Sequence, residues 1–114
     1  MIVRNKTKNT ILAKNLKVAK SPIDKFLGLL KKSNPESLLF NTRFGIHTLF
    51  LKKPLDIIIL NSQDVVEKTA TVFPNKFFLY NPKNYKVLEL PQGTIKRTKT
   101  KIGDRLSFSD NIYP

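Results

Sequence analysis

The most constraining feature of this sequence is a change of hydrophobic period at Ser37. From there onward, apolar residues either alternate with polar ones or form short runs, at residues 38–40, 46–51, 55–60, 65–72, 77–80 and 85–90. Aliphatic, β-branched and aromatic residues dominate these runs, and turn-forming residues separate them at the spacing of short strands. The pattern predicts a mainly β protein, built as a small antiparallel β-sandwich or barrel.

The first twenty residues favour further short strands. Ile11 and Ala13, and then Leu16 and Val18 one register later, lie two residues apart, and the lysines among them would protect the edges of a sheet. At the other end, Gly103 is expected to form a tight turn that leads into a last strand. Residues 61–64 are the clearest hairpin turn, between an apolar strand and its partner.

One helix is predicted over about residues 22–32. Ser21 is a suitable N-cap, Pro22 suits the first helical position, and Asp24 lies three residues after the cap. The apolar residues that follow lie at helical spacing, so the helix would pack one stripe against the sheet, and it ends before Pro35. We also allow for a short helical turn near residues 92–98.

The length of 114 residues, with 40% hydrophobic composition, predicts a single domain covering residues 1–114. The amino-terminal segment lacks the apolar stretch of a secretory signal, and no apolar run approaches the length of a membrane-spanning helix. We therefore expect a soluble, cytoplasmic protein.

The charge of the chain makes an anionic partner one candidate. The sequence has 21 Lys and Arg against 8 Asp and Glu, a net charge of +13 and a pI near 10.2. Such a field attracts nucleic acid and other polyanions. We favour a solvated lysine surface over a specific polyanion site, because only four of these residues are Arg. The candidate polyanion-binding residues are Lys6, Lys8, Lys14, Lys17, Lys20, Lys96, Arg97, Lys99 and Lys101.

Residue counts exclude most catalytic and metal centres. The chain has no Cys and one His, so a disulfide, a Cys-ligated metal or a centre with several His ligands cannot form within it. No standard nucleotide-binding, zinc-protease or serine-hydrolase motif is present, and we expect neither a cofactor nor a metal. A hydrolase with His47 as base and Asp56 as its orienting partner would lack an identifiable nucleophile, which favours a non-enzymatic protein.

Polar residues inside the apolar strands are the other candidates for a site. Asp56 lies in a strand that looks buried on both faces, so its carboxylate needs a hydroxyl, backbone amides or a cation as partner. The leading hypothesis is a recess for a small polar or saccharide-like ligand, lined by His47, Thr48, Lys52, Asp56, Glu89 and Asp104. The alternatives are structural: a satisfied His47, a loop held by Asp56, a surface ion pair at Glu89 and a turn at Asp104.

Six short motifs in this chain, in order and spacing, resemble the DUF192 (UPF0127) family. They read FLGLL at 26–30, LLF at 38–40, GIHT at 45–48, PLDI at 54–57, VLELP at 87–91 with Gly93, and GD at 103–104. The GIHT form resembles one subgroup of that family. The resemblance implies a small β-sandwich or barrel of jelly-roll type with one packed helix. It implies no catalytic residues, because the family has no known function.

Overall fold

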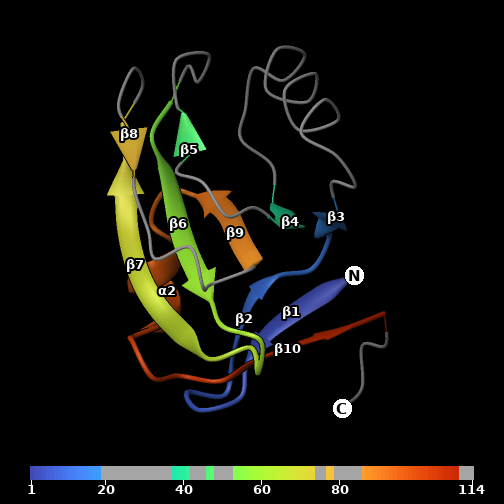
Figure 1. The fold of residues 1–114 in the computed structure, drawn as a ribbon. Helices are drawn as coiled ribbons and strands as arrows, with labels where there is room; N and C mark the ends of the chain where they lie inside the picture. Colours follow the sequence, from blue (N-terminus) through green and yellow to red (C-terminus); the bar gives the residue numbers. More distant parts are fainter. Residues whose placement is uncertain (19–36, 42–45, 48–52, 74–76, 79–85, 111–114) are drawn as a thin grey trace.

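Two β-sheets packed face to face account for most of the structure (Figure 1). This computed structural model describes residues 1–18, 37–41, 46–47, 53–73, 77–78 and 86–110. In the five-stranded sheet the order is β3 (Lys17–Val18), β4 (Leu38–Asn41), β9 (Lys86–Pro91), β6 (Leu55–Leu60) and β7 (Val66–Val72). In the three-stranded sheet the order is β10 (Leu106–Ser109), β1 (Ile2–Asn5) and β2 (Thr10–Ala13).

The remaining elements are short. Strand β5 (Ile46–His47) pairs with β8 (Phe77–Phe78), and a single helical turn, α2 (Thr94–Thr98), follows β9. The mainly β fold and the short helix near residues 92–98 are therefore confirmed. The helix predicted over residues 22–32 lies outside the described residues.

The hairpin between β6 and β7 forms where the sequence predicts it. The Asn61 side-chain oxygen accepts hydrogen bonds from the backbone N–H groups of Gln63 and Val65, at 2.9 and 3.0 Å. Asp64 has a φ of 62°, in the left-handed region that Asn and Asp tolerate best among non-glycine residues. Asn61 thus supplies the side-chain acceptor that closes the turn.

Strand β6 buries both of its faces, which explains its unbroken apolar sequence. On one face Ile58 and Leu60 pack with residues of β9 and of the three-stranded sheet, among them Val3 and Leu106. On the other face Ile57 and Ile59 pack with a second buried cluster. All residues of the strand are at most 2% exposed. Burying each such aliphatic side chain contributes about 2 kcal/mol, so β6 anchors the fold.

One strand pair differs from the predicted antiparallel arrangement. Strand β3 runs parallel to β4, with Lys17 opposite Leu38 and Val18 opposite Leu39. Parallel neighbours need a long crossover connection, and residues 19–36 provide enough chain for one. Hydrophobic periodicity reports which residues face the core and carries no information on strand direction, so the prediction was wrong for this pair.

Candidate functional site

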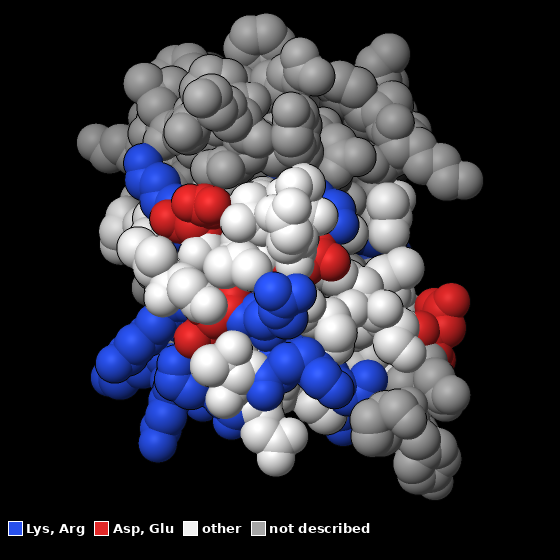
Figure 2. All heavy atoms as spheres, turned by 60° about the horizontal axis from the view of Figure 1, so that its bottom comes forward, with Lys and Arg blue, Asp and Glu red and all other residues white. Residues whose placement is uncertain are grey.

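Among the residues that the structure describes, positive charge is concentrated on the part formed by the two ends of the chain. Residues 1–18 and 91–110, which include the three-stranded sheet and α2, contain ten Lys or Arg and two Asp. The other described residues contain three Lys and four Asp or Glu. Blue side chains crowd the lower half of Figure 2, where this end of the molecule comes forward. We call the residues Lys6, Lys14, Lys96, Lys99 and Lys101 the basic face.

The lysines of the basic face keep their ammonium groups available. Within the described part of the chain, their side chains make no hydrogen bond and no ion pair, and all are exposed. Two other candidate residues are engaged. Lys8 contacts the Asp104 carboxylate at 2.9 Å, and Arg97 donates to the carbonyl oxygens of Ile11 and Leu12 at 3.1 Å each.

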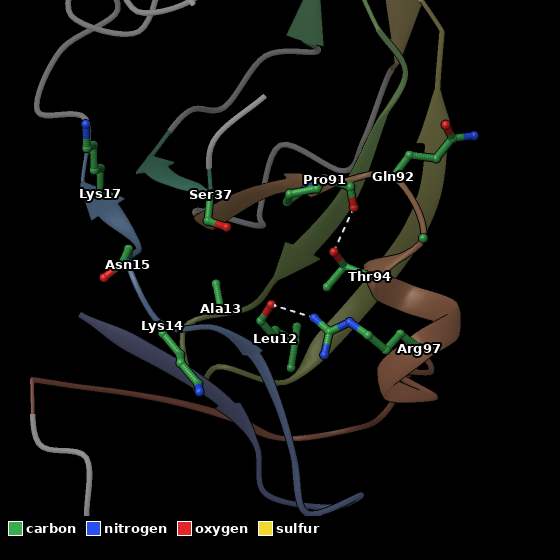
Figure 3. A pocket seen from close by; sticks show the side chains of 11 residues that line it. Leu12, Ala13, Lys14, Asn15, Lys17, Ser37, Pro91, Gln92, Thr94 and Arg97 are labelled. Atoms are coloured by element: carbon green, nitrogen blue, oxygen red, sulfur yellow. Dashed lines mark hydrogen bonds between the residues drawn. The ribbon is translucent and has the colours of Figure 1, made fainter. Parts of the chain in front are cut away.

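A cavity of about 590 Å³ lies beside the basic face, between β2, β3 and the turn that leads into α2 (Figure 3). Its walls carry three cations, Lys14, Lys17 and Arg97. The other lining residues are neutral: Leu12, Ala13, Asn15, Ser37, Pro91, Gln92, Gly93 and Thr94. None of the described residues that line the cavity is acidic.

Asp56 lies behind one wall of this cavity and holds the start of α2. Its Oδ2 accepts hydrogen bonds from the backbone N–H groups of Gly93 and Ile95, at 3.1 and 2.9 Å, and its Oδ1 accepts one from the Thr71 hydroxyl at 2.7 Å. The side chain is buried, with the residue 1% exposed. The expected amide and hydroxyl partners are confirmed, and the carboxylate caps a helix to which it does not belong.

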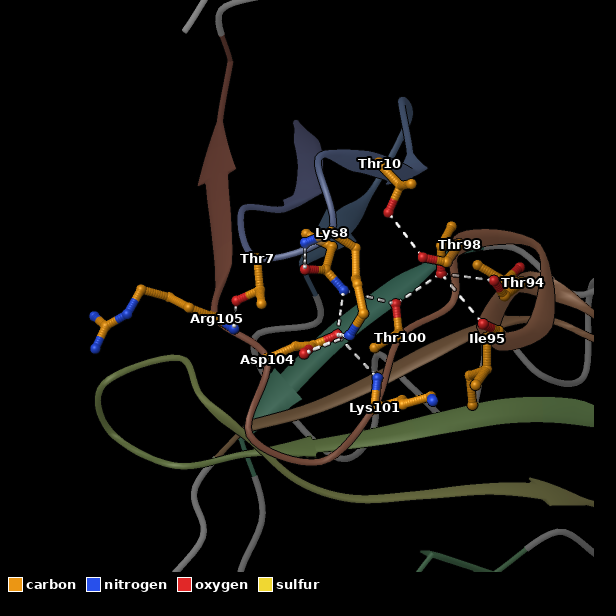
Figure 4. A network of polar contacts seen from close by, with 11 residues as sticks. Thr7, Lys8, Thr10, Thr94, Ile95, Thr98, Thr100, Lys101, Asp104 and Arg105 are labelled. Atoms are coloured by element: carbon orange, nitrogen blue, oxygen red, sulfur yellow. Dashed lines mark hydrogen bonds and ion pairs between the residues drawn. The ribbon is translucent and has the colours of Figure 1, made fainter.

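Asp104 holds the segment that follows α2, at the centre of a polar network (Figure 4). Its carboxylate accepts hydrogen bonds from the Asn5 amide, the Lys8 ammonium and the Lys101 backbone N–H, at 2.9 to 3.0 Å. Burial raises the pKa of Asp104, but these hydrogen bonds and the charge of Lys8 outweigh burial and hold the pKa below its ordinary value. The carboxylate is therefore ionised at neutral pH.

Thr98, the last residue of α2, and Thr100, which follows the helix, extend this network. The Thr98 hydroxyl lies 2.7 Å from that of Thr100, which accepts a hydrogen bond from Asn5 at 3.1 Å. The carbonyl oxygen of Thr98 accepts another from Thr10 on β2, at 3.0 Å. The first strands of the chain are thus joined to the segment around α2 by side chains.

Glu89 does not share a site with Asp56. The register between β6 and β9 places Glu89 opposite Ile57 and Asp56 opposite Leu90. Because side chains alternate along a strand, the two carboxylates point to opposite faces of the sheet. Glu89 is 1% exposed, so the interpretation as a surface ion pair was wrong. The structure therefore does not bring Asp56, Glu89 and Asp104 into one recess.

The other predicted site residues fall at or beyond the edge of the described chain. His47 ends β5, where it pairs with Phe77, and its side chain is outside the description. Thr48, Lys52 and Lys20 also lie outside the described residues. In the described chain, no group of three His, Asp or Glu residues could hold a metal ion.

Sequence reasoning missed Asn5 and the threonines of the Asp104 network. Asn5 is 0% exposed, and its amide partners lie 95 and 99 residues further along the chain. The only sequence signal is a polar residue at the end of an apolar strand, and that signal does not identify a partner so distant in the chain.

The comparison that decides the family covers nearly the whole chain. The family model DUF192, "Uncharacterized ACR", matches residues 2–108. The chain belongs to the DUF192 family. This DUF192 chain is 30% identical to a UPF0127 protein of Pyrococcus furiosus, over 95% of the chain and 98% of that protein. It is 29% identical to a UPF0127 protein of Pyrococcus horikoshii, with the same coverage.

Two crystal structures share the fold of this DUF192 chain. A protein of unknown function from Novosphingobium aromaticivorans has a TM-score of 0.76 at 18% identity, covering 94% of this chain and 83% of that one. A protein described as a putative transcription regulator, from Sinorhizobium meliloti, has a TM-score of 0.74 at 20% identity, covering 93% and 89%. These likenesses establish the fold. Among the described residues of this DUF192 chain, no helix is long and apolar enough to cross a membrane.

Proposed function

We propose that this protein binds nucleic acid through the phosphate backbone, with the basic face as its contact surface. The observation that carries the proposal is the uneven charge: ten Lys or Arg against two Asp in residues 1–18 and 91–110, and three Lys against four acids in the rest of the described chain. A field concentrated on one part of the surface orients the protein on a polyanion and speeds their encounter.

The residue types on this surface favour binding that does not depend on base sequence. All five residues of the basic face are lysines, whose ammonium groups contact phosphates as point charges. Arg is the residue that reads guanine with two parallel hydrogen bonds, and the guanidinium of Arg97 is already bound to two carbonyl oxygens of β2. We therefore expect contacts that position the protein on the backbone without selecting a sequence.

The rival hypothesis of a recess for a neutral polar or saccharide-like ligand has less support. It needs the carboxylates of Asp56 and Glu89 on one side of the sheet, and the register separates them. Asp56 and Asp104 both direct their oxygens at backbone N–H groups and at hydrogen-bonding side chains. These acids hold the fold together, which leaves the lysines as the chemically available groups.

The test is a salt titration of binding to labelled DNA. Fluorescence anisotropy with a duplex of about 20 base pairs, between about 50 and 200 mM NaCl, should give a log Kd that rises by about 0.9 per phosphate contact for each unit of log salt. With four or five lysines in contact, affinity should fall about a hundredfold or more over that range. A second duplex of different sequence should bind equally well.

A pair of matched double variants locates the surface. Lys96→Gln with Lys101→Gln removes two charges of the basic face and should reduce the salt slope by about two contacts. Lys53→Gln with Lys68→Gln removes the same charge from the other part of the molecule and should leave the slope unchanged. Absence of binding at the lower salt concentration, or equal loss in both variants, would refute the proposal. Binding to heparin but not to DNA would refute the nucleic-acid assignment.

A further inference from the structure

The cavity beside the basic face has the size and the lining of a small-molecule site. Its volume of about 590 Å³ falls within the range of about 300 to 1,000 Å³ that such sites occupy. Apolar surface comes from Leu12, Ala13 and Pro91, and neutral polar groups come from Asn15 and Gln92. A lining of this mixture suits an organic molecule with polar substituents.

Three cations set the charge that such a molecule should carry. Figure 3 shows Lys14 and Lys17 on the side formed by the amino-terminal segment and Arg97 across the cavity, on α2. Asp56 lies behind the wall and offsets part of this charge, but its carboxylate faces the N–H groups of Gly93 and Ile95. Lys14 and Arg97 alone outnumber this acid, so an anion gains more here than a neutral molecule, and a dianion gains most.

Arg97 is held in place before any ligand arrives. Its Nη1 and Nη2 donate to the carbonyl oxygens of Ile11 and Leu12, at 3.1 Å each, and these bonds anchor the guanidinium against β2. The remaining N–H groups of the guanidinium are not committed in these bonds. A cation that is already positioned loses little conformational entropy on binding.

We propose that this cavity binds a small organic phosphate, with Lys14 and Arg97 contacting the phosphate and the apolar wall contacting the organic part. A phosphomonoester carries close to two negative charges at neutral pH and several strong acceptor oxygens, which match the cations around the cavity. Among the described residues, the site shares Lys14 alone with the basic face, because Lys6, Lys96, Lys99 and Lys101 do not line the cavity.

The experiment is an NMR titration of ¹⁵N-labelled protein with ribose 5-phosphate, with ribose as the matched neutral probe. Ribose 5-phosphate should produce saturable shifts at amides of the lining, such as Asn15, Gln92 and Gly93, within about 10 mM. Ribose at the same concentration should produce none of them. Shifts that never saturate, or that ribose reproduces, would overturn the proposal.

Matched variants separate this site from the residues of the basic face that do not line the cavity. Lys14→Gln with Lys17→Gln should weaken binding of ribose 5-phosphate about tenfold, because two cations leave the cavity. Lys96→Gln with Lys101→Gln should change it less than about twofold. Thermal unfolding of both variants checks that the fold is retained, and Lys14→Gln alone serves if the double variant unfolds. Equal weakening in both double variants would overturn the proposal and indicate general charge attraction.

Discussion

Two buried aspartates accept hydrogen bonds from backbone N–H groups at the two ends of α2. Asp56 accepts from the N–H groups of Gly93 and Ile95 before and within the helix, and Asp104 accepts from the N–H of Lys101 after it. For Asp104, the hydrogen bonds that its carboxylate accepts stabilise the ionised form despite burial. The segment after β9 is therefore held by side chains from outside the helix.

Asp104 makes the free energy of unfolding depend on pH in the acidic range. Its pKa is lowered in the folded state, so its contribution is complete above the ordinary pKa of about 3.9 and is lost as the pH falls through the folded-state value. We expect Asp104→Asn to cost about 2 kcal/mol at pH 7 and to flatten the loss of stability below about pH 4. Urea unfolding at a series of pH values measures both effects.

Asp110 provides the control for this prediction. Its side chain is 91% exposed and lies 3.9 Å from the amino terminus, so Asp110→Asn should leave the unfolding free energy nearly unchanged at every pH. Parallel stability curves for wild type and Asp104→Asn would contradict the role given to Asp104.

The surroundings of Asp56 could be predicted from the sequence, whereas those of Asn5 could not. Asp56 sits in an apolar strand, so both its burial and the kinds of partner it needs follow from local context. Asn5 is equally buried, but its partners Thr100 and Asp104 come from the other end of the chain. Asn5 and these two partners meet only in the folded structure, so no local sequence pattern predicts the contact.

Helix α2 has five residues and depends on its neighbours for stability. Arg97 forms one such link, because its two terminal nitrogens donate to adjacent carbonyl oxygens of β2. Lysine can reach only one of these oxygens well. We expect Arg97→Lys to cost about 1 kcal/mol in urea unfolding and to speed hydrogen exchange at the residue-97 amide, which donates to Gly93.

Lys96→Gln is the control for the link between α2 and β2. Lys96 lies on the same helix, and its side chain contacts none of the described residues through a hydrogen bond or an ion pair. Its substitution should change the unfolding free energy by less than about 0.5 kcal/mol. If Arg97→Lys behaves in the same way, the two carbonyl contacts contribute nothing to stability.

The strands were predicted better than their pairing. Short apolar runs bounded by turn residues, such as residues 55–60, identify β6 because a strand buried on both faces needs apolar side chains on both. The parallel pairing of β3 with β4 was missed because β3 has only two residues, both exposed, and leaves almost no pattern. Strand direction depends on the path of the intervening chain.

The uneven charge should make the folded protein sensitive to salt. In residues 1–18 and 91–110 ten cations outnumber two acids, so the excess cations repel one another in the native state, and dissolved ions screen that repulsion. We expect the Tm to rise by about 2 to 6 °C between about 20 and 300 mM NaCl. Differential scanning fluorimetry measures the change.

The double variants described above also test the origin of this salt effect. Lys96→Gln with Lys101→Gln should raise the Tm at low salt and reduce its increase with salt, whereas Lys53→Gln with Lys68→Gln should leave the size of that increase as in wild type. A Tm that stays flat or falls with NaCl would contradict native-state repulsion.

The net charge of +13 is readable from the sequence, but its placement is not. The two basic ends of the chain meet because β1 pairs with both β10 and β2, and because Asn5 reaches Asp104. The sequence identifies the candidate lysines, but how they group on the surface depends on this long-range pairing. The cavity has the same origin, since its walls come from residues 12–17 and 91–97 as well as Ser37.

The pairing of β1 with β10 sets an order for folding during translation. Residues of β1 leave the ribosome first, but the strand lies between β2 and β10, and β10 is made about a hundred residues later. Until residues 100–104 emerge, the Asn5 amide has only water as a partner for the bonds it later makes to Thr100 and Asp104. The earliest strand to be synthesised is thus among the last to be completed, and a nascent chain halted before β10 would expose one edge of β1 to other proteins.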